Sequence, residues 1–277
     1  MSKEELGKKI IRMLYDAGMI ETWYKDKADG WILVSGLWSP LYINLRPLAS
    51  RPDSRKILTQ VGSAMGKMIR ENIPSINKLV GLYMAGIPLA TAITMTTGIP
   101  SCYAGNLPNI KSLEDFYREI GKLKKELEEH GQHKLVEGDL CDDDHVAIVD
   151  DLVTTFKTKL IARAQIYEAA KDRGVKINCE DVIVLIDREQ GAKETASSLG
   201  MRLWSLIPFK SKGIEWLKDK MTPVEYEVIV EYFENPQKFQ NPEVQNKLRV
   251  LAQRGKITGK IMLKSRPEHH TTLPRKH

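Results

Sequence analysis

Residues 145–160, HVAIVDDLVTTFKTKL, decide how the fold of this chain is interpreted. A short apolar run leads into two acids, Asp150 and Asp151, and a hydroxyl-rich stretch then precedes a helical pattern. The acids can accept hydrogen bonds from sugar hydroxyls, while loop amides and a helix start can hold a phosphate. An acidic turn that only caps a helix explains the same pattern. The segment alone therefore leaves a phosphosugar site and a structural turn open.

Strand and helix patterns alternate on both sides of this segment. Strands are expected at 78–83, 99–103, 145–149, 182–186 and 203–207, and helices at 87–95, 158–171 and 192–199. Repeated strand–helix–strand units predict an α/β fold, with a mostly parallel sheet and helices on both faces. Ligands bind such sheets beyond the carboxyl ends of the strands, which is where Asp150 and Asp151 are expected.

The flanking regions are less regular. Helices are expected in ELGKKIIRMLYDAGMI (5–20), where Ser2 can cap the start, and at 53–70, with two short strands, 31–34 and 41–45, between them. Residues 106–132 form a polar stretch longer than an ordinary connection, and 113–129 within it has a helical pattern. After about residue 236 the periodicity fades, so 237–277 is expected to be a basic, polar extension.

Composition excludes several classes of protein. The 277 residues are 42% hydrophobic and 28% charged, which is unlike a disordered or fibrous chain. There is no apolar run of about 20 residues and no signal-peptide core, so a cytoplasmic protein that contacts no membrane is expected. Most of the +6 net charge follows residue 240 and lacks interleaved aromatic residues, so nucleic acid is not an expected partner. Cys102, Cys141 and Cys179 have no metal-type spacing.

Five segments, in chain order, resemble the orotate phosphoribosyltransferases, a family of type I phosphoribosyltransferases. Residues 145–160 are similar to its signature, in which two acids precede a threonine-rich loop that binds the 5-phosphate of phosphoribosyl pyrophosphate. The other segments are SGLWSPLYINLR (35–46), GIPLA (86–90), KKELEEHGQHKLVEG (124–138) and VIVLIDREQG (182–191). The resemblance implies a type I phosphoribosyltransferase fold with a small N-terminal hood over residues 1–236, in which 106–132 form a mobile loop with an insertion.

The resemblance implies a role for each matched residue. The acids that bind the ribose and the loop residues that approach the pyrophosphate make up a catalytic set: Asp150, Asp151, Lys125 and His130. The phosphoribosyl group would be bound by Thr154, Thr155, Lys157, Thr158 and Lys124. The base would be bound by Ser35, Gly36, Ser39, Tyr42 and Arg188. No dedicated metal site is implied, because the family's Mg²⁺ is held mainly through the substrate, near Asp150 and Asp151.

Plainer interpretations of several of these residues stay open. The Arg188 guanidinium suits a planar carboxylate, but a surface ion pair with Asp187 or Glu189 also explains it. Ser35 and Ser39 also suit an ordinary turn. The loop sequence KLKKELEEH equally fits a solvated helix with ion pairs four residues apart.

The chain departs from the family pattern around the expected pyrophosphate. Phe156 replaces a glycine that would allow positive φ and close approach to a phosphate. Residues that replace family lysines are Glu128, Ala85 and Val34, and Asn44 replaces an acid. The lysines removed are positive charges, and Glu128 adds a negative one. Lysines close in sequence are candidates to replace them, namely Lys122, Lys157 and Lys159.

The resemblance implies transfer of phosphoribose from phosphoribosyl pyrophosphate to orotate, giving orotidine monophosphate and pyrophosphate, in pyrimidine biosynthesis. Mg²⁺ would be the cofactor, and the family's loop reaches across a dimer interface, so a homodimer is implied. The departures support two alternatives. One is a non-catalytic regulatory protein that binds a nucleotide or pyrimidine on the same scaffold, and the other is a phosphoribosyltransferase with a different acceptor base.

Overall fold

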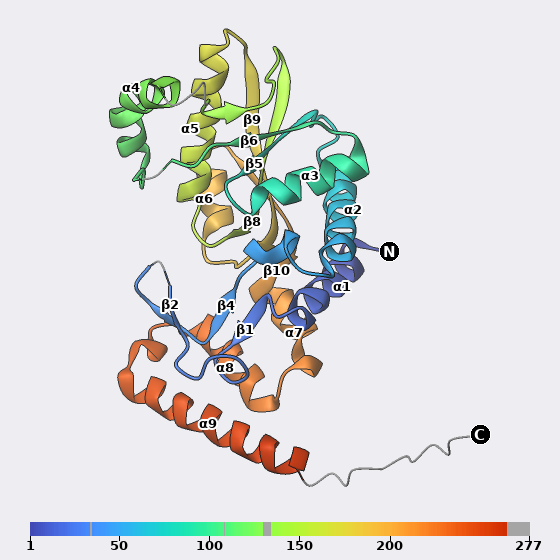
Figure 1. Ribbon diagram of the computed structural model, residues 1–277, viewed down its shortest axis with the longest axis vertical. Coiled ribbons are helices and arrows are strands. Elements are labelled where there is room, and N and C mark those ends of the chain that lie inside the picture. Colours follow the sequence, from blue (N-terminus) through green and yellow to red (C-terminus); the bar gives the residue numbers. More distant parts are fainter. Residues whose placement is uncertain (34, 108, 130–133, 265–277) are drawn as a thin grey trace, which may run out of the picture. The chain divides into compact units, whose positions relative to one another are not determined.

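The computed structural model describes residues 1–33, 35–107, 109–129 and 134–264 (Figure 1). The chain forms two compact units, each built from two stretches of sequence. Unit 1 comprises residues 1–19 and 44–220, and unit 2 comprises residues 20–43 with the chain from 221 onward. The expected domain of residues 1–236 with an extension at 237–277 stays a prediction.

Six strands form the central sheet of unit 1, in the order β10–β9–β8–β5–β6–β7. Their bounds are β5 Lys78–Leu82, β6 Ser101–Ala104, β7 Val136–Glu137, β8 Asp144–Val153, β9 Ile177–Asp187 and β10 Arg202–Pro208. Neighbouring strands are parallel, except that β7 pairs with β6 in the antiparallel sense. This arrangement confirms the α/β class and the mostly parallel sheet.

Helices cover both faces of this sheet. Their bounds are α1 Lys3–Asp16, α2 Ser54–Asn72, α3 Gly86–Thr97, α4 Leu113–Glu129, α5 Lys157–Asp172, α6 Ala192–Ser198 and the short α7 Ile214–Trp216. In Figure 1, α4, α5 and α6 lie on one side of the sheet and α1, α2 and α3 on the other. Val146 and Ile148 of β8 belong to the same hydrophobic cluster as Ile166 of α5. Because both faces are covered, the strands are nearly continuous apolar runs.

Strand β8 is longer than its apolar run predicts. The expected strand ended at 149, but the pairing continues, with Asp150 opposite Val184 and Val153 opposite Asp187 of β9. The backbone ladder of a central strand can continue through polar residues, so hydrophobic periodicity alone places this end too early. Both acids therefore stand within the strand, not after it.

Unit 2 combines four short N-terminal strands, of which β2 and β4 fall on the two expected stretches and β1 and β3 were not predicted, with C-terminal helices. Strand β1 Ile20–Thr22 pairs with β4 Leu41–Ile43, and β2 Trp31–Ile32 pairs with β3 Trp38–Ser39, both antiparallel. The helices are α8 Pro223–Glu234 and α9 Pro242–Lys264. The rings of Trp38 and Phe239 stack with centroids 6.3 Å apart, and Thr22 of β1 donates a hydrogen bond to Glu225 of α8.

Helix α9 was not predicted from the sequence. Its buried side chains include Leu248 and Ala252, which are four residues apart and form a narrow apolar stripe. Basic residues are frequent in the sequence of this segment, so it resembles a polar extension when the sequence is read alone. Among the described residues, no helix is both apolar enough and long enough to span a bilayer.

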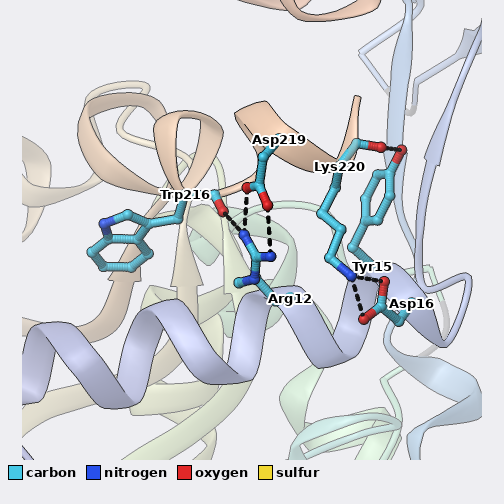
Figure 2. A network of polar contacts seen from close by, with 6 residues as sticks. All are labelled: Arg12, Tyr15, Asp16, Trp216, Asp219 and Lys220. Atoms are coloured by element: carbon cyan, nitrogen blue, oxygen red, sulfur yellow. Dashed lines mark hydrogen bonds and ion pairs between the residues drawn. The ribbon is translucent and has the colours of Figure 1, made fainter. Parts of the chain in front are cut away.

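Polar contacts join α1 to the last residues of unit 1 (Figure 2). Arg12 Nη2 donates to Asp219 Oδ2 at 2.8 Å, and this guanidinium lowers the pKa of Asp219 to about 2. Lys220 Nζ donates to both carboxylate oxygens of Asp16, at 2.8 and 2.9 Å. Asn44 N donates to Met19 O at 2.8 Å. The chain leaves unit 1 after Met19, returns at Asn44 and leaves again after Lys220. These contacts therefore hold each of the three points to α1 or to the residues just after it.

Candidate active site

The candidate site is built on the passage from β8 through residues 154–156 into α5. Thr155, Lys157 and Thr158 are exposed there, and Thr154 is half-buried. The first turn of α5 has no side-chain cap, so its first amides are available to an anion. The turn therefore offers hydroxyls, an ammonium and helix amides to a single phosphate group.

A cavity of about 200 Å³ lies beside this turn. Asp150 and Thr158 line it, together with residues that follow β5 and β6, such as Tyr83 and Asn106. The cavity is therefore at the carboxyl ends of three parallel strands, as expected for an α/β ligand site. Gln165 of α5 also lines the cavity. Its side-chain amide donates to Leu135 O at 2.6 Å, which holds the residue just before β7 against α5.

A buried lysine neutralises the first acid. Lys159 Nζ lies 2.6 Å from Asp150 Oδ2 and donates to Leu152 O at 3.0 Å. Only 4% of the Lys159 side chain and 13% of the Asp150 side chain are exposed. The sequence singled out Lys159 merely as a nearby spare cation, whereas its ammonium is already paired. The sequence did contain a signal that Lys159 is buried. The residues three positions before and after it, Phe156 and Ala162, are apolar, which places Lys159 on the apolar face of the helix.

The second acid is in a different electrostatic state. Burial, and then the neighbouring Asp150 carboxyl, raise the pKa of Asp151 to about 7. Asp151 Oδ1 accepts the amide of Leu152 at 2.8 Å, and the amide of Asp151 donates to Asp150 Oδ1 at 2.9 Å. Near neutral pH, therefore, Asp151 can bind or release a proton, while Asp150 is ion-paired.

Phe156 does not project from the phosphate turn. Its side chain is 1% exposed and belongs to the same hydrophobic cluster as Val153 and Ile166. Its φ of −87° is accessible to any residue, so this turn does not need a glycine's positive φ at 156. The backbone of the turn thus accommodates the phenylalanine by directing the ring into the core.

The turn between β5 and α3 is packed closely against β8. A Cβ atom at Gly86 would lie 2.3 Å from Val149 O, and one at Gly81 would lie 2.8 Å from Gly86 O. Only glycines permit this approach, which places the start of α3 beside Val149 of β8. Ala85, which replaces a family lysine, is the buried N-cap residue of α3.

The predicted loop lysines lie on α4. Lys124 forms ion pairs of 2.6 Å with Glu168 and Asp172 of α5. Asp172 ends α5, about 20 Å along the helix from Thr158 by the rise per residue. Lys125 is exposed and lies 4.0 Å from Glu129. The structure thus shows the ion-paired helix that the sequence allowed, and it does not bring Lys124 to Asp150 of the same chain.

Three positions of interest lie outside what the structure describes. His130 and Val34 are not among the described residues, and the side chain of Glu128 is not described. The roles predicted for His130 and for the exchanges at 34 and 128 therefore stay predictions.

The predicted base-binding residues belong to both units. Arg188, in unit 1, is 6% exposed, and its amide donates to Val153 O at 3.1 Å. Its side chain is therefore not on the surface, and both its predicted role in base binding and an ion pair with Asp187 or Glu189 stay predictions. In unit 2, Ser39 is fully buried and donates to Leu41 O at 2.7 Å, which is turn chemistry. Ser35 and Gly36 are exposed, with Gly36 at a φ of +80°.

The last base-binding candidate, Tyr42, stacks on Trp31 with ring centroids 5.8 Å apart. It is half-buried and belongs to unit 2. That these unit 2 residues and Arg188 bind one base stays a prediction.

The carboxylates present suit a metal ion that arrives with its substrate. Among the described residues, no group of three His, Cys, Asp or Glu side chains is placed to hold a metal. Asp150 is paired with Lys159, whereas Asp151 has no ion pair within the part of the chain that the structure describes. Mg²⁺ commonly takes one or two carboxylates and otherwise binds phosphates and water. The site therefore fits Mg²⁺ held mainly by a polyphosphate, not by the protein.

Known proteins resemble this chain in sequence and fold. No protein-family model matches the sequence. The orotate phosphoribosyltransferase of Pyrococcus abyssi is 30% identical over 209 residues, which cover 74% of this chain and 92% of that protein. The orotate phosphoribosyltransferase of Aeropyrum pernix superposes with a TM-score of 0.53 at 21% identity, covering 76% of this chain and 97% of that one.

A larger protein also shares the fold. The UMP synthase of Leishmania donovani superposes with a TM-score of 0.63 at 22% identity and covers 82% of this chain. The present chain spans 42% of that protein.

Proposed function

The chain belongs to the orotate phosphoribosyltransferase family, and we propose that it transfers phosphoribose from phosphoribosyl pyrophosphate to N1 of orotate. The products would be orotidine monophosphate and pyrophosphate, a step of pyrimidine biosynthesis. The observation that carries the proposal is the acid pair beside an uncapped, threonine-rich helix start at the carboxyl end of β8. Fold alone would not establish an activity, so the proposal rests on this site.

Different residues of this chain would bind the phosphate, the ribose and the base. The first amides of α5, with the hydroxyls of Thr155 and Thr158, would bind the 5-phosphate. The carboxylates of β8 would accept hydrogen bonds from the ribose hydroxyls. The C1′–O bond to pyrophosphate would break and the leaving group would take the electron pair. N1 of orotate would form the new bond to C1′ and release its proton to solvent. Arg188 would donate paired hydrogen bonds to the planar carboxylate of orotate.

Mg²⁺, a second copy of the chain and a cytoplasmic location complete the proposal. When bound, Mg²⁺ would neutralise charge on the leaving pyrophosphate. A homodimer in which α4 of one copy serves the other would account for the separation of Lys124 from Asp150 within one chain. Three unpaired cysteines, of which Cys102 and Cys179 are buried, suit a reducing compartment.

A second candidate function is binding without turnover. Lys159 pairs with Asp150, and Ala85 and Phe156 replace residues that the family uses near the phosphates. Losing one stabilising contact at a developing charge can cost on the order of 10²–10³ in rate, so several losses would leave a binding protein. A third candidate keeps the transfer but changes the acceptor base.

Turnover of orotate tests these candidates. Purified protein is mixed with phosphoribosyl pyrophosphate, Mg²⁺ and orotate, and orotidine monophosphate is quantified by chromatography. Turnover is expected, and Asp151→Asn should lower it by on the order of 10²-fold or more. Asp53→Asn is the matched control, because Asp53 is exposed and its side chain makes no capping hydrogen bond.

Negative results would separate the alternatives. Calorimetric binding of phosphoribosyl pyrophosphate without turnover of any base would support the binding protein. Turnover with uracil or another base, but not with orotate, would support the changed acceptor. No binding of phosphoribosyl pyrophosphate at all would exclude the site as described.

A further inference from the structure

The Lys159 side chain is held inside unit 1, at the acid pair. Its ammonium is 2.6 Å from Asp150 Oδ2 and 3.0 Å from Leu152 O. An ammonium has three donors, and two of them are used by these acceptors. Asp150 Oδ1 accepts the Asp151 amide at 2.9 Å, so each carboxylate oxygen of Asp150 has a donor. The carboxylate is thereby fixed in direction.

Asp150, whose carboxylate is fixed in this way, is one of the residues that line the cavity beside the phosphate turn. The Lys159 side chain is only 4% exposed, so solvent screens its charge little. A divalent cation on Asp150 would meet a positive charge already bonded to the same carboxylate. Charges of one sign repel each other more strongly in a partly buried site than in water. The pair therefore disfavours a second cation there.

We infer that Lys159 is a positioning residue and a built-in cation of the acid pair. It aims the Asp150 carboxylate into the cavity, and it prevents the substrate-free protein from binding a divalent cation at Asp150. The location of the substrate rests on the proposed function, whereas the exclusion of the metal from the free protein does not depend on it.

The inference explains how a site that lost lysines can still accept a polyanion. Ala85 replaces one cation of the family pattern, whereas Lys159 reduces the negative charge that a pyrophosphate would meet at β8. Repulsion between the acid pair and the substrate is thereby lowered from inside the protein. A divalent cation would then enter the site with the pyrophosphate and not ahead of it.

Mn²⁺ binding to the substrate-free protein tests the inference. Free Mn²⁺ is measured by electron paramagnetic resonance for the wild type, for Lys159→Met and for the double variant Lys159→Met/Asp150→Asn. Lys159→Met should bind one Mn²⁺ at least tenfold more tightly than the wild type, because an uncompensated carboxylate is exposed to the cavity. The double variant has the same methionine without the charge and should return to the wild-type affinity.

A second measurement covers the case in which Lys159→Met does not fold. Asp150→Asn in the wild-type background should leave Mn²⁺ affinity unchanged, because Lys159 already occupies that carboxylate. A loss of Mn²⁺ binding in Asp150→Asn would overturn the inference. So would a folded Lys159→Met, checked by circular dichroism, whose Mn²⁺ affinity equals that of the wild type.

Activity separates this inference from the proposed function. Formation of orotidine monophosphate by the wild type is measured on the same preparations. Turnover without the Mn²⁺ differences would refute the role of Lys159 and leave the enzyme intact. The Mn²⁺ differences without turnover would support the role of Lys159 on a scaffold that does not catalyse transfer to orotate.

Discussion

Strand β8 has a buried lysine–aspartate pair near each of its ends. At its start, Lys78 Nζ lies 3.6 Å from Asp144 Oδ2, and at the other end Lys159 Nζ lies 2.6 Å from Asp150 Oδ2. At the start, Lys78 also donates to Asp139 O, and Asp144 accepts the amide of Cys141, each at 2.8 Å. Those contacts fasten the connection between β7 and β8.

The two pairs differ in what surrounds them. Asp150 lines a cavity, and it is near the carboxyl ends of the parallel strands, where α/β proteins bind ligands. Asp144 is at the opposite end, where its neighbours are the chain's own backbone groups. The same lysine–aspartate chemistry therefore stabilises the fold at Asp144 and sets the charge of the candidate site at Asp150.

Replacing the lysine at the structural end should have the largest effect. Lys78→Met would leave Asp144 buried without its counter-ion, which typically costs about 3–5 kcal/mol of unfolding free energy. Urea unfolding measures this loss. The double variant Lys78→Met/Asp144→Asn should recover most of it, and binding of phosphoribosyl pyrophosphate should not change. Impaired binding of phosphoribosyl pyrophosphate in a folded Lys78→Met would contradict the claim that the Lys78–Asp144 pair is only structural.

The stability of Asp151→Asn should depend on pH. The folded-state pKa of Asp151, about 7, lies above its ordinary value of 3.8, so the folded protein retains the proton longer than the unfolded chain. The wild type therefore loses stability as pH rises from about 4 to about 7, by up to about 4 kcal/mol. Asparagine does not ionise, so the unfolding free energy of Asp151→Asn should not fall in this way. As pH rises from about 4 to about 7, the variant should therefore become more stable relative to the wild type.

Urea unfolding at pH 4.5 and pH 8 tests the pH dependence. Asp53→Asn, the same substitution at an exposed position, is measured alongside as the control. A stability difference between Asp151→Asn and the wild type that is constant with pH would contradict the assignment.

Another buried carboxylate on the sheet, Asp181, has a partner that reaches in from the surface. Arg202 donates to both oxygens of Asp181, at 2.8 and 2.7 Å, and Trp204 Nε1 donates to the same carboxylate at 2.8 Å. Arg202→Ala leaves the Trp204 bond in place and allows water to approach Asp181. The expected cost is about 1–3 kcal/mol, less than at Lys78. Thermal unfolding measures it, and a larger loss than in Lys78→Met would reverse the order.

The smallest effect is expected between α4 and α5. Lys124→Ala removes two partly exposed ion pairs, with Glu168 and Asp172, and should cost about 1 kcal/mol or less. Lys122→Ala is the control, because its pair with Glu126 is more exposed. Both losses should shrink at high salt. A large fall in turnover from Lys124→Ala, with little change in stability, would instead support a phosphate-binding role for Lys124.

Much of the fold could be predicted from local patterns. Three predicted features depend only on neighbours in sequence, and each is present. They are the N-terminal helix capped by Ser2, the helix expected at 53–70 and the apolar runs of the parallel strands. Helix α9 was missed, because its narrow apolar stripe is hidden among charged residues. Its burial depends on residues far away in the chain, as shown by the close approach of Gly255 to Tyr24.

The sequence by itself determined the alternation of strands and helices from β5 to β10, the presence of two acids beside a threonine-rich helix start, and the family to which the chain is similar. Only the tertiary structure decided the state of those acids. Spacing in sequence cannot show that Lys159 turns inward to Asp150, or that Phe156 directs its ring into the core. Charge pairing and burial depend on which helix packs on which strand. HVAIVDDLVTTFKTKL therefore identifies where chemistry is expected, and the packing of α5 on β8 sets the charge there.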